Sequence, residues 1–283
     1  MIRSDRFCMA AVMGWPVMHS RSPLMHNYWM EHQGLNGTYV PLAIEPGQIG
    51  PALRAMHPLG FAGCNLTIPH KQAAMEVVDE VDEVAKKIGA ISCVVVHEDG
   101  SLLGTNNDWL GFRGNLGEFY PDWRTDSGPV TVIGAGGGGR AVCYALLEKG
   151  VTELRLVNRT QERAEKLAEE LGGGITVYPW EDRHDLLSGV AIAVNVTSQG
   201  MQGEAALDIR LDALPREAIV ADIIYIPLET PFLATARARG NRTLNGVGML
   251  LHQGPPAWKR WFNMEPAVTQ ELRKRMEVSI RGY

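Results

Sequence analysis

Residues 63–71 read GCNLTIPHK, a short apolar run that we interpret as a strand and that breaks at Pro69 before His70 and Lys71. Most lysines lie on solvated faces, so a lysine at the mouth of an apolar strand is a candidate for chemistry. Asn65 and Thr67 precede it at a two-residue spacing. Alternation along a strand puts these two side chains on one face, where they could bind hydroxyl groups of a ligand.

A second stretch, residues 129–150, reads PVTVIGAGGGGRAVCYALLEKG, a β-branched strand followed by a glycine run and a helix over 140–149. The order strand, turn and helix is the context that the dinucleotide-binding fingerprint requires. Gly134 would allow the tight turn, Gly136 would let the backbone approach a pyrophosphate, and Gly139 would let helix and strand pack closely. The remaining glycines of the expected cofactor loop are Gly137 and Gly138. The alternative is a glycine-rich turn that binds nothing.

The next strand, ELRLVNRT at 153–160, indicates which dinucleotide is bound. In an NAD site this strand usually ends in Asp or Glu, which accepts from the ribose 2′-hydroxyl. Here it ends in Asn158 and Arg159, with Thr160 and Arg163 in the following turn. Amide donors and positive charge suit a 2′-phosphate, so we expect NADP. Alternatively, both arginines are ordinary solvated charges of a surface helix.

Composition narrows the class of partner. The chain has 283 residues, 45% hydrophobic and 21% charged, with a net charge of −5 and a pI near 5.9. This balance gives no basic footprint for nucleic acid, so a small molecule is the expected partner. The cysteines occur singly and predict buried, reduced thiols rather than a disulfide framework or a metal site; they are Cys8, Cys64, Cys93 and Cys143. The sequence has no signal-peptide pattern and no run of about 18 apolar residues, so we expect a cytoplasmic protein without a membrane partner.

Strands and helices alternate along the chain, which indicates an α/β fold. We expect strands over 7–13, 38–42 and 63–71, helices over 23–33, 45–60 and 72–87, and a hairpin over 91–106 with its turn at Asp99-Gly100. The polar loop at 121–129 leads into a new βαβ series. We therefore expect a second domain to start near Gly111.

Further motifs follow in order. The set is HSRSPLMHN at 19–27, NLTIPHK at 65–71, GTNNDWLGF at 104–112, GAGGGGRA at 134–141, NRT at 158–160, NVTSQGM at 195–201, DIIYIPLETPFL at 222–233 and NGVGMLLHQ at 245–253. In these motifs the chain resembles the shikimate dehydrogenase family, with its quinate/shikimate relatives, over nearly its whole length. The resemblance implies an α/β substrate domain over 1–110, completed by C-terminal helices within 250–283, a Rossmann-type NADP-binding domain over 111–249, and an active site in the cleft between them. It also implies NADP-dependent interconversion of shikimate and 3-dehydroshikimate by hydride transfer.

The resemblance assigns catalysis to two residues, since Lys71 and Asp108 match the family's catalytic lysine and aspartate. An amine beside a substrate hydroxyl can move its proton and stabilise developing alkoxide charge. A free lysine has a pKa of about 10.4, so burial or nearby charge must tune Lys71 if it acts as a base. A carboxylate favours the charged lysine, which suits Asp108 to orienting the amine and holding the same hydroxyl. The alternative is a plain ion pair.

Other positions match substrate and nicotinamide contacts of the family. Ser20 and Ser22 match the pair that holds the substrate carboxylate, although serines before a helix are also common caps. Asn65 and Thr67 would bind ring hydroxyls. The later matches are Tyr225 and Gln253 for the substrate, and Thr197 and Met249 beside the nicotinamide. Tyr225 and Met249 could instead be core side chains.

One departure from the family pattern touches chemistry. GAISCVV at 89–95 stands where the family has Gly-Ala-x-Asn-Thr, so Ser92 replaces an asparagine that contacts a substrate hydroxyl. Serine has one donor where an amide has two, so a ring hydroxyl could be left underbonded or bridged by water. His70 and Trp109 are smaller departures, and Trp109 adds bulk next to Asp108.

Three alternatives therefore stay open at the level of sequence. A paralogue could act on quinate or another hydroxylated cyclohexene or cyclohexane carboxylate, which Ser92 favours. A non-catalytic NADP-binding regulatory protein would not need both Lys71 and Asp108. A folate-type methylene dehydrogenase would not need the serine pair of HSRSP. The chain is expected to be a monomer or a homodimer.

Overall fold

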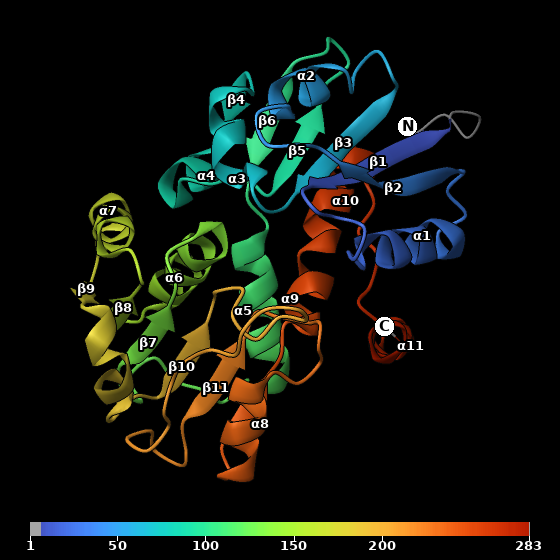
Figure 1. Cartoon of the computed structure of the whole chain (residues 1–283). Coiled ribbons are helices and arrows are strands. Elements are labelled where there is room, and N and C mark those ends of the chain that lie inside the picture. Colours follow the sequence, from blue (N-terminus) through green and yellow to red (C-terminus); the bar gives the residue numbers. More distant parts are fainter. Residues whose placement is uncertain (1–6, 283) are drawn as a thin grey trace. The chain divides into compact units, whose positions relative to one another are not determined.

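The computed structural model describes residues 7–282, which divide into two compact units (Figure 1). Within these residues, the first unit is the chain up to Asn107 together with Gln253–Met276. The second unit is Asp108–His252 together with residues 277–282. Each unit is built around a six-stranded sheet.

The sheet of the first unit has the strand order β2-β1-β3-β5-β6-β4. Its strands are β1 (Cys8–Gly14), β2 (Gly37–Ala43), β3 (Phe61–Leu66), β4 (Glu80–Val81), β5 (Cys93–Val96) and β6 (Leu102–Thr105). β1 is parallel to β2 and β3, and its apolar run CMAAVMG is buried by neighbours on both sides. β5 and β6 form the predicted hairpin, in which Gly100 takes a φ of +86° at the turn. The expected strands over 7–13 and 38–42 and the helix over 23–33 are confirmed, the last as α1 (Ser22–His32).

Two expected helices of the first unit are wrong as drawn from the sequence. The helix expected over 45–60 is only α2 (Ile49–Arg54), because Gly47 takes a left-handed φ of +87° and the chain turns before Gln48. The stretch expected as one helix over 72–87 is divided into α3 (His70–Ala73), a 3-10 turn (Ala74–Glu76), β4 and α4 (Glu83–Ile88). β3 ends at Leu66, so Lys71 lies on the short helix α3 and not on the strand.

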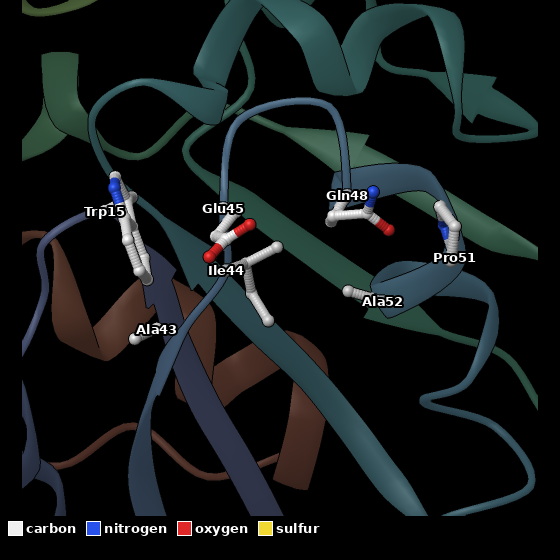
Figure 2. Close-up of a pocket in the computed structure, with 7 residues that line it drawn as sticks. All are labelled: Trp15, Ala43, Ile44, Glu45, Gln48, Pro51 and Ala52. Atoms are coloured by element: carbon white, nitrogen blue, oxygen red, sulfur yellow. The ribbon is translucent and has the colours of Figure 1, made fainter.

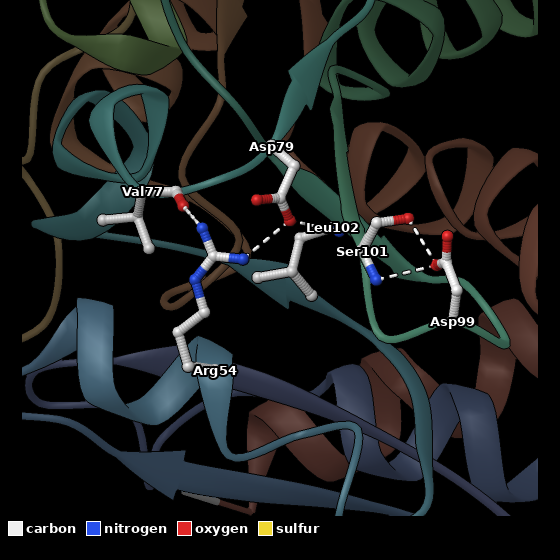
Figure 3. Close-up of polar contacts among 6 residues, drawn as sticks. All are labelled: Arg54, Val77, Asp79, Asp99, Ser101 and Leu102. Carbon is white, nitrogen blue, oxygen red and sulfur yellow. Dashed lines mark hydrogen bonds and ion pairs between the residues drawn. The ribbon is translucent and has the colours of Figure 1, made fainter.

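Polar side chains hold the divided stretch in place (Figure 3). The Asp79 carboxylate accepts from Arg54 at 2.6 Å and from the Leu102 amide at 2.8 Å, which joins α2 to the β4–β6 edge. Arg54 also donates to the carbonyl oxygen of Val77. These bonds fix a bend where periodicity alone indicates a continuous helix. Asp82 then starts α4 by accepting from the Ala85 amide at 2.7 Å.

The second unit is a doubly wound, fully parallel sheet of order β12-β11-β10-β7-β8-β9. Its strands are β7 (Val130–Ile133), β8 (Leu154–Val157), β9 (Ile175–Tyr178), β10 (Ile192–Asn195), β11 (Ile219–Asp222) and β12 (Arg242–Leu244). Its helices are α5 (Asp108–Phe119), α6 (Gly137–Lys149), α7 (Gln161–Leu171), α8 (Pro231–Ala238) and α9 (Val247–His252), with a 3-10 segment at Trp180–Leu187. The strand order reverses between β7 and β10, where such sheets bind ligands.

The C-terminal segment returns to the first unit through α10 (Gly254–Phe262), with α11 (Gln270–Arg281) after it. Trp261 donates from its indole nitrogen to the carbonyl oxygen of Val94 at 2.9 Å, and Trp258 donates to Nδ1 of His26 at 2.7 Å. A Cβ on Gly63 would lie 2.1 Å from the indole nitrogen of Trp261, so this glycine is required for the close approach of α10.

The cysteines are free, as predicted, and Cys64, Cys93 and Cys143 are buried whereas Cys8 is half-buried. Burial raises the pKa of both Cys93 and Cys143 to about 12. Among residues 7–282, no helix is both long enough and apolar enough to span a bilayer.

Candidate active site

Lys71 is half-buried on α3 and has a fixed backbone, because its carbonyl oxygen accepts from the Ile91 amide at 2.8 Å. The next residue in that partner segment is Ser92. His70 is 1% exposed, and its Nε2 lies 2.8 Å from the carbonyl oxygen of Ile44. The histidine that departs from the family pattern therefore ties α3, which carries Lys71, to the residue that follows β2.

The side chain of Asn65 is held in one orientation by two bonds. The Tyr39 hydroxyl donates to its Oδ1 at 2.8 Å, and its Nδ2 donates to the carbonyl oxygen of Ser92 at 3.3 Å. The amide nitrogen keeps a second N–H that these two bonds do not use. Asn65 can therefore present a donor to a ligand hydroxyl. Sequence reasoning found Asn65 but missed Tyr39, because 26 residues separate the two.

Ser92 is 2% exposed, and its hydroxyl oxygen accepts from the Asn107 amide at 2.8 Å. Because the oxygen is engaged as an acceptor, the hydroxyl hydrogen is oriented away from Asn107 and can donate elsewhere. The bond also places Ser92 beside the residue that precedes Asp108 in the chain. The side chain of Asn107 is buried, at 1% exposure.

The two serines of the first motif lie at the start of α1, but neither is its cap. Arg21 occupies the N-cap position without a side-chain cap bond, which corrects the capping alternative. Instead, the Ser20 hydroxyl oxygen accepts from the Ser22 amide at 3.2 Å. Ser22 is 6% exposed and Ser20 is half-buried.

Thr67 and Gln253 complete the predicted substrate contacts of the first unit. Thr67 follows the end of β3, and its amide donates to the carbonyl oxygen of Met13 at 2.9 Å, so the extended pairing continues one residue past the strand. A Cβ on Gly14 would lie 2.3 Å from Cγ2 of Thr67, which shows how tightly the two strand ends pack. Gln253 is half-buried at the N-cap of α10.

A pocket of about 460 Å³ opens elsewhere on the first unit (Figure 2). Its lining residues are Trp15, Ala43, Ile44, Glu45, Gln48, Pro51 and Ala52. None of these is a predicted site residue, so we do not count this pocket as part of the candidate site.

The glycine loop of the second unit has the geometry of a dinucleotide site. Gly134 has a φ of +118°, and a Cβ on Gly139 would lie 2.5 Å from the carbonyl oxygen of Gly134. A Cβ on Gly136, by contrast, would meet no atom within 4 Å. Gly136 therefore faces open space at the N-cap of α6, where backbone amides and the helix dipole favour an anion. The helix begins at Gly137, three residues before the start expected from the sequence.

Asn158 links this loop to the second cofactor segment. Its Oδ1 accepts from the Ala135 amide at 3.1 Å, and its Nδ2 donates to the carbonyl oxygen of Thr160 at 2.7 Å. Arg159 and Arg163 are both exposed, and no ion pair within residues 7–282 includes either. Both guanidinium groups therefore stay available to a phosphate.

The remaining predicted residues of the second unit differ in environment. Asp108 is 1% exposed and is the first residue of α5. Tyr225 and Thr197 are half-buried, whereas Met249 is 8% exposed and belongs to the apolar core. The Trp109 ring packs edge-on against Tyr144 at 5.4 Å, so much of its bulk is used within the core of this unit.

Comparison with known proteins identifies the family. Residues 12–94 match the model of the shikimate dehydrogenase substrate binding domain, and residues 122–205 match that of shikimate / quinate 5-dehydrogenase. The shikimate dehydrogenase (NADP(+)) of Paramagnetospirillum magneticum is 49% identical over 270 residues, 95% of this chain and 98% of the relative. The chain belongs to the shikimate dehydrogenase family.

Solved structures of this family agree with the fold over almost the whole chain. Shikimate 5-dehydrogenase from Thermus thermophilus, in complex with NADP(H) and shikimate, is 36% identical with a TM-score of 0.84, over 97% of this chain and 99% of that one. Quinate dehydrogenase from Corynebacterium glutamicum in complex with NAD is 30% identical with a TM-score of 0.87, over 98% and 100%. The predicted membership of the shikimate dehydrogenase family and the predicted α/β fold class are confirmed.

Proposed function

We propose that the protein interconverts shikimate and 3-dehydroshikimate with NADP as the hydride carrier. The observation that carries this proposal is the likeness to the Thermus thermophilus enzyme, whose structure holds both NADP(H) and shikimate and whose chain aligns with 97% of this one. The 49% identity to an NADP-dependent relative supports the same substrate and cofactor.

The proton chemistry falls to two residues of this chain. The bound NADP⁺ would supply the hydride acceptor for the carbon that carries the hydroxyl, and the protein would take up the hydroxyl proton. We assign Lys71 and Asp108 to that hydroxyl, with the lysine amine moving the proton or stabilising the alkoxide and the carboxylate orienting it. The Ile91 amide donates to the carbonyl oxygen of Lys71, which supports this role because a fixed backbone limits where the amine can reach.

The substrate carboxylate is assigned to Ser20 and Ser22, whose hydroxyl groups lie at the start of α1. The ring hydroxyls are assigned to Asn65, Thr67 and Ser92. The bonds of Asn65 and Ser92 leave one N–H and one O–H donor, respectively, for this purpose. Tyr225 and Gln253 are assigned further contacts to the substrate.

NADP is assigned to the loop at the start of α6 and to the end of β8. The open space at Gly136 suits a pyrophosphate, and the close packing of Gly139 suits the turn that holds it. The 2′-phosphate is assigned to Asn158, Arg159, Thr160 and Arg163, with Thr197 and Met249 beside the nicotinamide. The absence of any carboxylate at the end of β8 supports NADP over NAD, because an acidic residue there would repel the phosphate.

A second candidate substrate is quinate, and Ser92 is the observation that favours it. The serine is shorter than the asparagine of the family pattern, so more room is left at one ring hydroxyl. The relative named as a quinate dehydrogenase shares the fold over 98% of this chain.

Initial rates with both substrates and both nucleotides test the proposal. The formation of reduced nicotinamide is followed by absorbance with shikimate or quinate and with NADP⁺ or NAD⁺. Fast turnover of shikimate with NADP⁺, lost in Lys71→Ala, is the expected result. Turnover of quinate alone would favour the second candidate, and nucleotide binding without turnover of either would favour a regulatory protein.

Location and assembly are part of the same proposal. Buried free thiols suit a reducing compartment, which supports the cytoplasm. Light scattering after gel filtration distinguishes the two expected states, monomer and homodimer.

A further inference from the structure

Asp222 is a buried carboxylate, 2% exposed, at the carboxyl end of β11. Its oxygens accept from the backbone amide of Ile224 at 3.0 Å, the Thr230 hydroxyl at 2.7 Å and the side-chain Nδ2 of Asn195 at 3.2 Å. Burial raises its pKa to about 6, although these three donors partly offset the effect. Burying a carboxylate costs free energy, so space alone would be filled better by an apolar residue of similar size.

Asn195 connects Asp222 to the segment of Thr197, which is assigned to the nicotinamide. It lies opposite Asp222 at the end of β10, and its Nδ2 also donates to the carbonyl oxygen of Gln199 at 3.1 Å. Its Oδ1 accepts from both the amide of Thr197, at 3.0 Å, and the hydroxyl of Thr197, at 2.8 Å. The Thr197 oxygen in turn accepts from the Gln199 amide at 3.1 Å. The conformation of segment 195–199 therefore depends on the orientation of the side-chain amide of Asn195. The bonds from this amide to the Asp222 carboxylate fix that orientation.

Ile224 connects Asp222 to Tyr225, which is assigned to the substrate, and to the start of α9. Its amide is held by the carboxylate, and Tyr225 is the next residue. Its carbonyl oxygen accepts from the Gly246 amide at 2.9 Å, just before the helix α9 that contains Met249. A Cβ on Gly246 would lie 2.0 Å from the carbonyl oxygen of Ile223, so this approach is close and permits only glycine.

We propose that Asp222 is a positioning residue, whose carboxylate holds the segments of Thr197, Tyr225 and Met249 in the arrangement that receives the nicotinamide and the substrate ring. Asp222 touches neither ligand; it acts through Asn195 and Ile224. The carboxyl ends of adjacent parallel strands are where ligands bind in such sheets, which is where this cluster lies. The identity of the two ligands rests on the proposed function.

Asp222→Asn is the first test, because it keeps the size of the side chain and turns one acceptor into a donor that faces other donors. We expect kcat/KM for NADP⁺ and for shikimate to fall about tenfold to a hundredfold, with a parallel rise in the Kd for NADPH measured by fluorescence. The double variant Asn195→Asp/Asp222→Asn exchanges donor and acceptor across the pair. It is expected to be more active than either single variant.

A matched control lies at the other end of the same sheet. Asn241 is 5% exposed, and its Nδ2 donates to the carbonyl oxygens of Pro215, Arg216 and Ala218, which precede β11. Asn241→Ala is expected to lower Tm but to leave kcat, KM and the Kd for NADPH unchanged below that temperature. Thr230→Val removes one bond to Asp222 and the cap bond from the Leu233 amide, and it provides a second variant if Asp222→Asn does not fold. Thr230→Ser keeps both bonds and is expected to retain the wild-type constants.

Kinetic constants and NADPH affinity that stay at wild-type values in Asp222→Asn or Thr230→Val, with only Tm lowered, would overturn the proposal and leave a structural role. If the wild type does not turn over shikimate, the proposed function fails separately. The Kd for NADPH then decides alone, and an unchanged value in these variants would also overturn the positioning role.

Discussion

At the scale of the residue, buried polar groups in this protein fix which atoms of the site face outward. Asn65 shows this well, since its bonds with Tyr39 and the Ser92 carbonyl oxygen fix the orientation of the amide and leave one N–H unused by these two partners. Ser92 shows it again, because its oxygen is occupied by the Asn107 amide. In the proposed site, Asn65 and Ser92 therefore each keep a donor that a ring hydroxyl of the substrate would accept.

Tyr39→Phe tests this orientation. Removing the hydroxyl leaves Oδ1 of Asn65 without its donor and lets the amide rotate, so we expect the KM for shikimate to rise about tenfold. The KM for NADP⁺ is expected to stay within about twofold, since Tyr39 belongs to the first unit. Equal changes in both constants would show that the tyrosine supports the fold rather than Asn65.

His26 gives a pH dependence at the same scale. It is 1% exposed, stacks on Tyr39 at 4.0 Å and accepts from Trp258, and burial lowers its pKa from 6.5 to about 3. Between pH 6.5 and about pH 3, His26 is protonated in the unfolded chain but neutral in the folded chain. The free energy of unfolding therefore decreases as the pH falls through this range.

Between pH 7.5 and pH 5, His26 is expected to cost the fold about 2 kcal/mol of unfolding free energy. His26→Gln keeps an acceptor for Trp258 and does not titrate. Urea unfolding at the two pH values is expected to show a smaller loss for the variant than for the wild type. Equal losses in both proteins would mean that the folded protein does not lower the pKa of His26.

At the scale of the element, two glycines of the loop at 134–139 are expected to have different roles, Gly139 in folding and Gly136 in cofactor binding. Gly139 packs against the backbone of Gly134, whereas Gly136 faces open space, although both belong to one motif. Gly139→Ala is expected to lower both Tm and NADP⁺ affinity, because the loop must move. Gly136→Ala is expected to keep the Tm of the unliganded protein and to raise the KM for NADP⁺ at least tenfold, since the new methyl group fills space used by the pyrophosphate. Calorimetry and initial rates check both; unchanged NADP⁺ kinetics in Gly136→Ala would place the cofactor elsewhere.

Element prediction from the sequence succeeded where local signals agree. The hairpin at β5–β6 has its turn at Asp99-Gly100, and the strand–glycine–helix unit at β7–α6 carries its own fingerprint. Prediction failed where contacts between residues far apart in the sequence determine the local structure. In the stretch over 72–87, the bonds of Asp79 to Arg54 and to the Leu102 amide hold a bend that interrupts the expected helix. Among candidate site residues, those that match the family's known contacts were named in advance, and their roles stay predictions. Asp222 and Asn195 begin two of the quoted motifs but were given no role, and Tyr39 lies outside the motifs, because the importance of all three comes from contacts across strands.

At the scale of the whole molecule, each unit has its own sheet and its own apolar core. The segment Gln253–Met276 belongs to the first unit, where three indole nitrogens donate to His26, Val94 and Ala267. Among the described residues, the first unit therefore combines the chain up to Asn107 with Gln253–Met276, and the second is continuous apart from residues 277–282.

The two units are expected to respond to different ligands. NADP⁺ at about 100 times its Kd adds about 2.7 kcal/mol to a state that binds it, and the glycine loop belongs to the second unit. Thermal unfolding followed by calorimetry is expected to show that NADP⁺ raises one transition more than the other and that shikimate does the reverse. A single transition that either ligand alone shifts by the same amount would contradict separate units.

The central claim is hydride transfer from shikimate to NADP⁺, and label transfer tests it most directly. Shikimate that carries deuterium on the carbon of the oxidised hydroxyl is turned over with NADP⁺, and both products are analysed by mass spectrometry. We expect one deuterium in each molecule of reduced nucleotide, none in the dehydroshikimate, and no product from Lys71→Ala. Reduced nucleotide without deuterium, or none at all from the wild type while NADP⁺ binds, would contradict the proposed reaction.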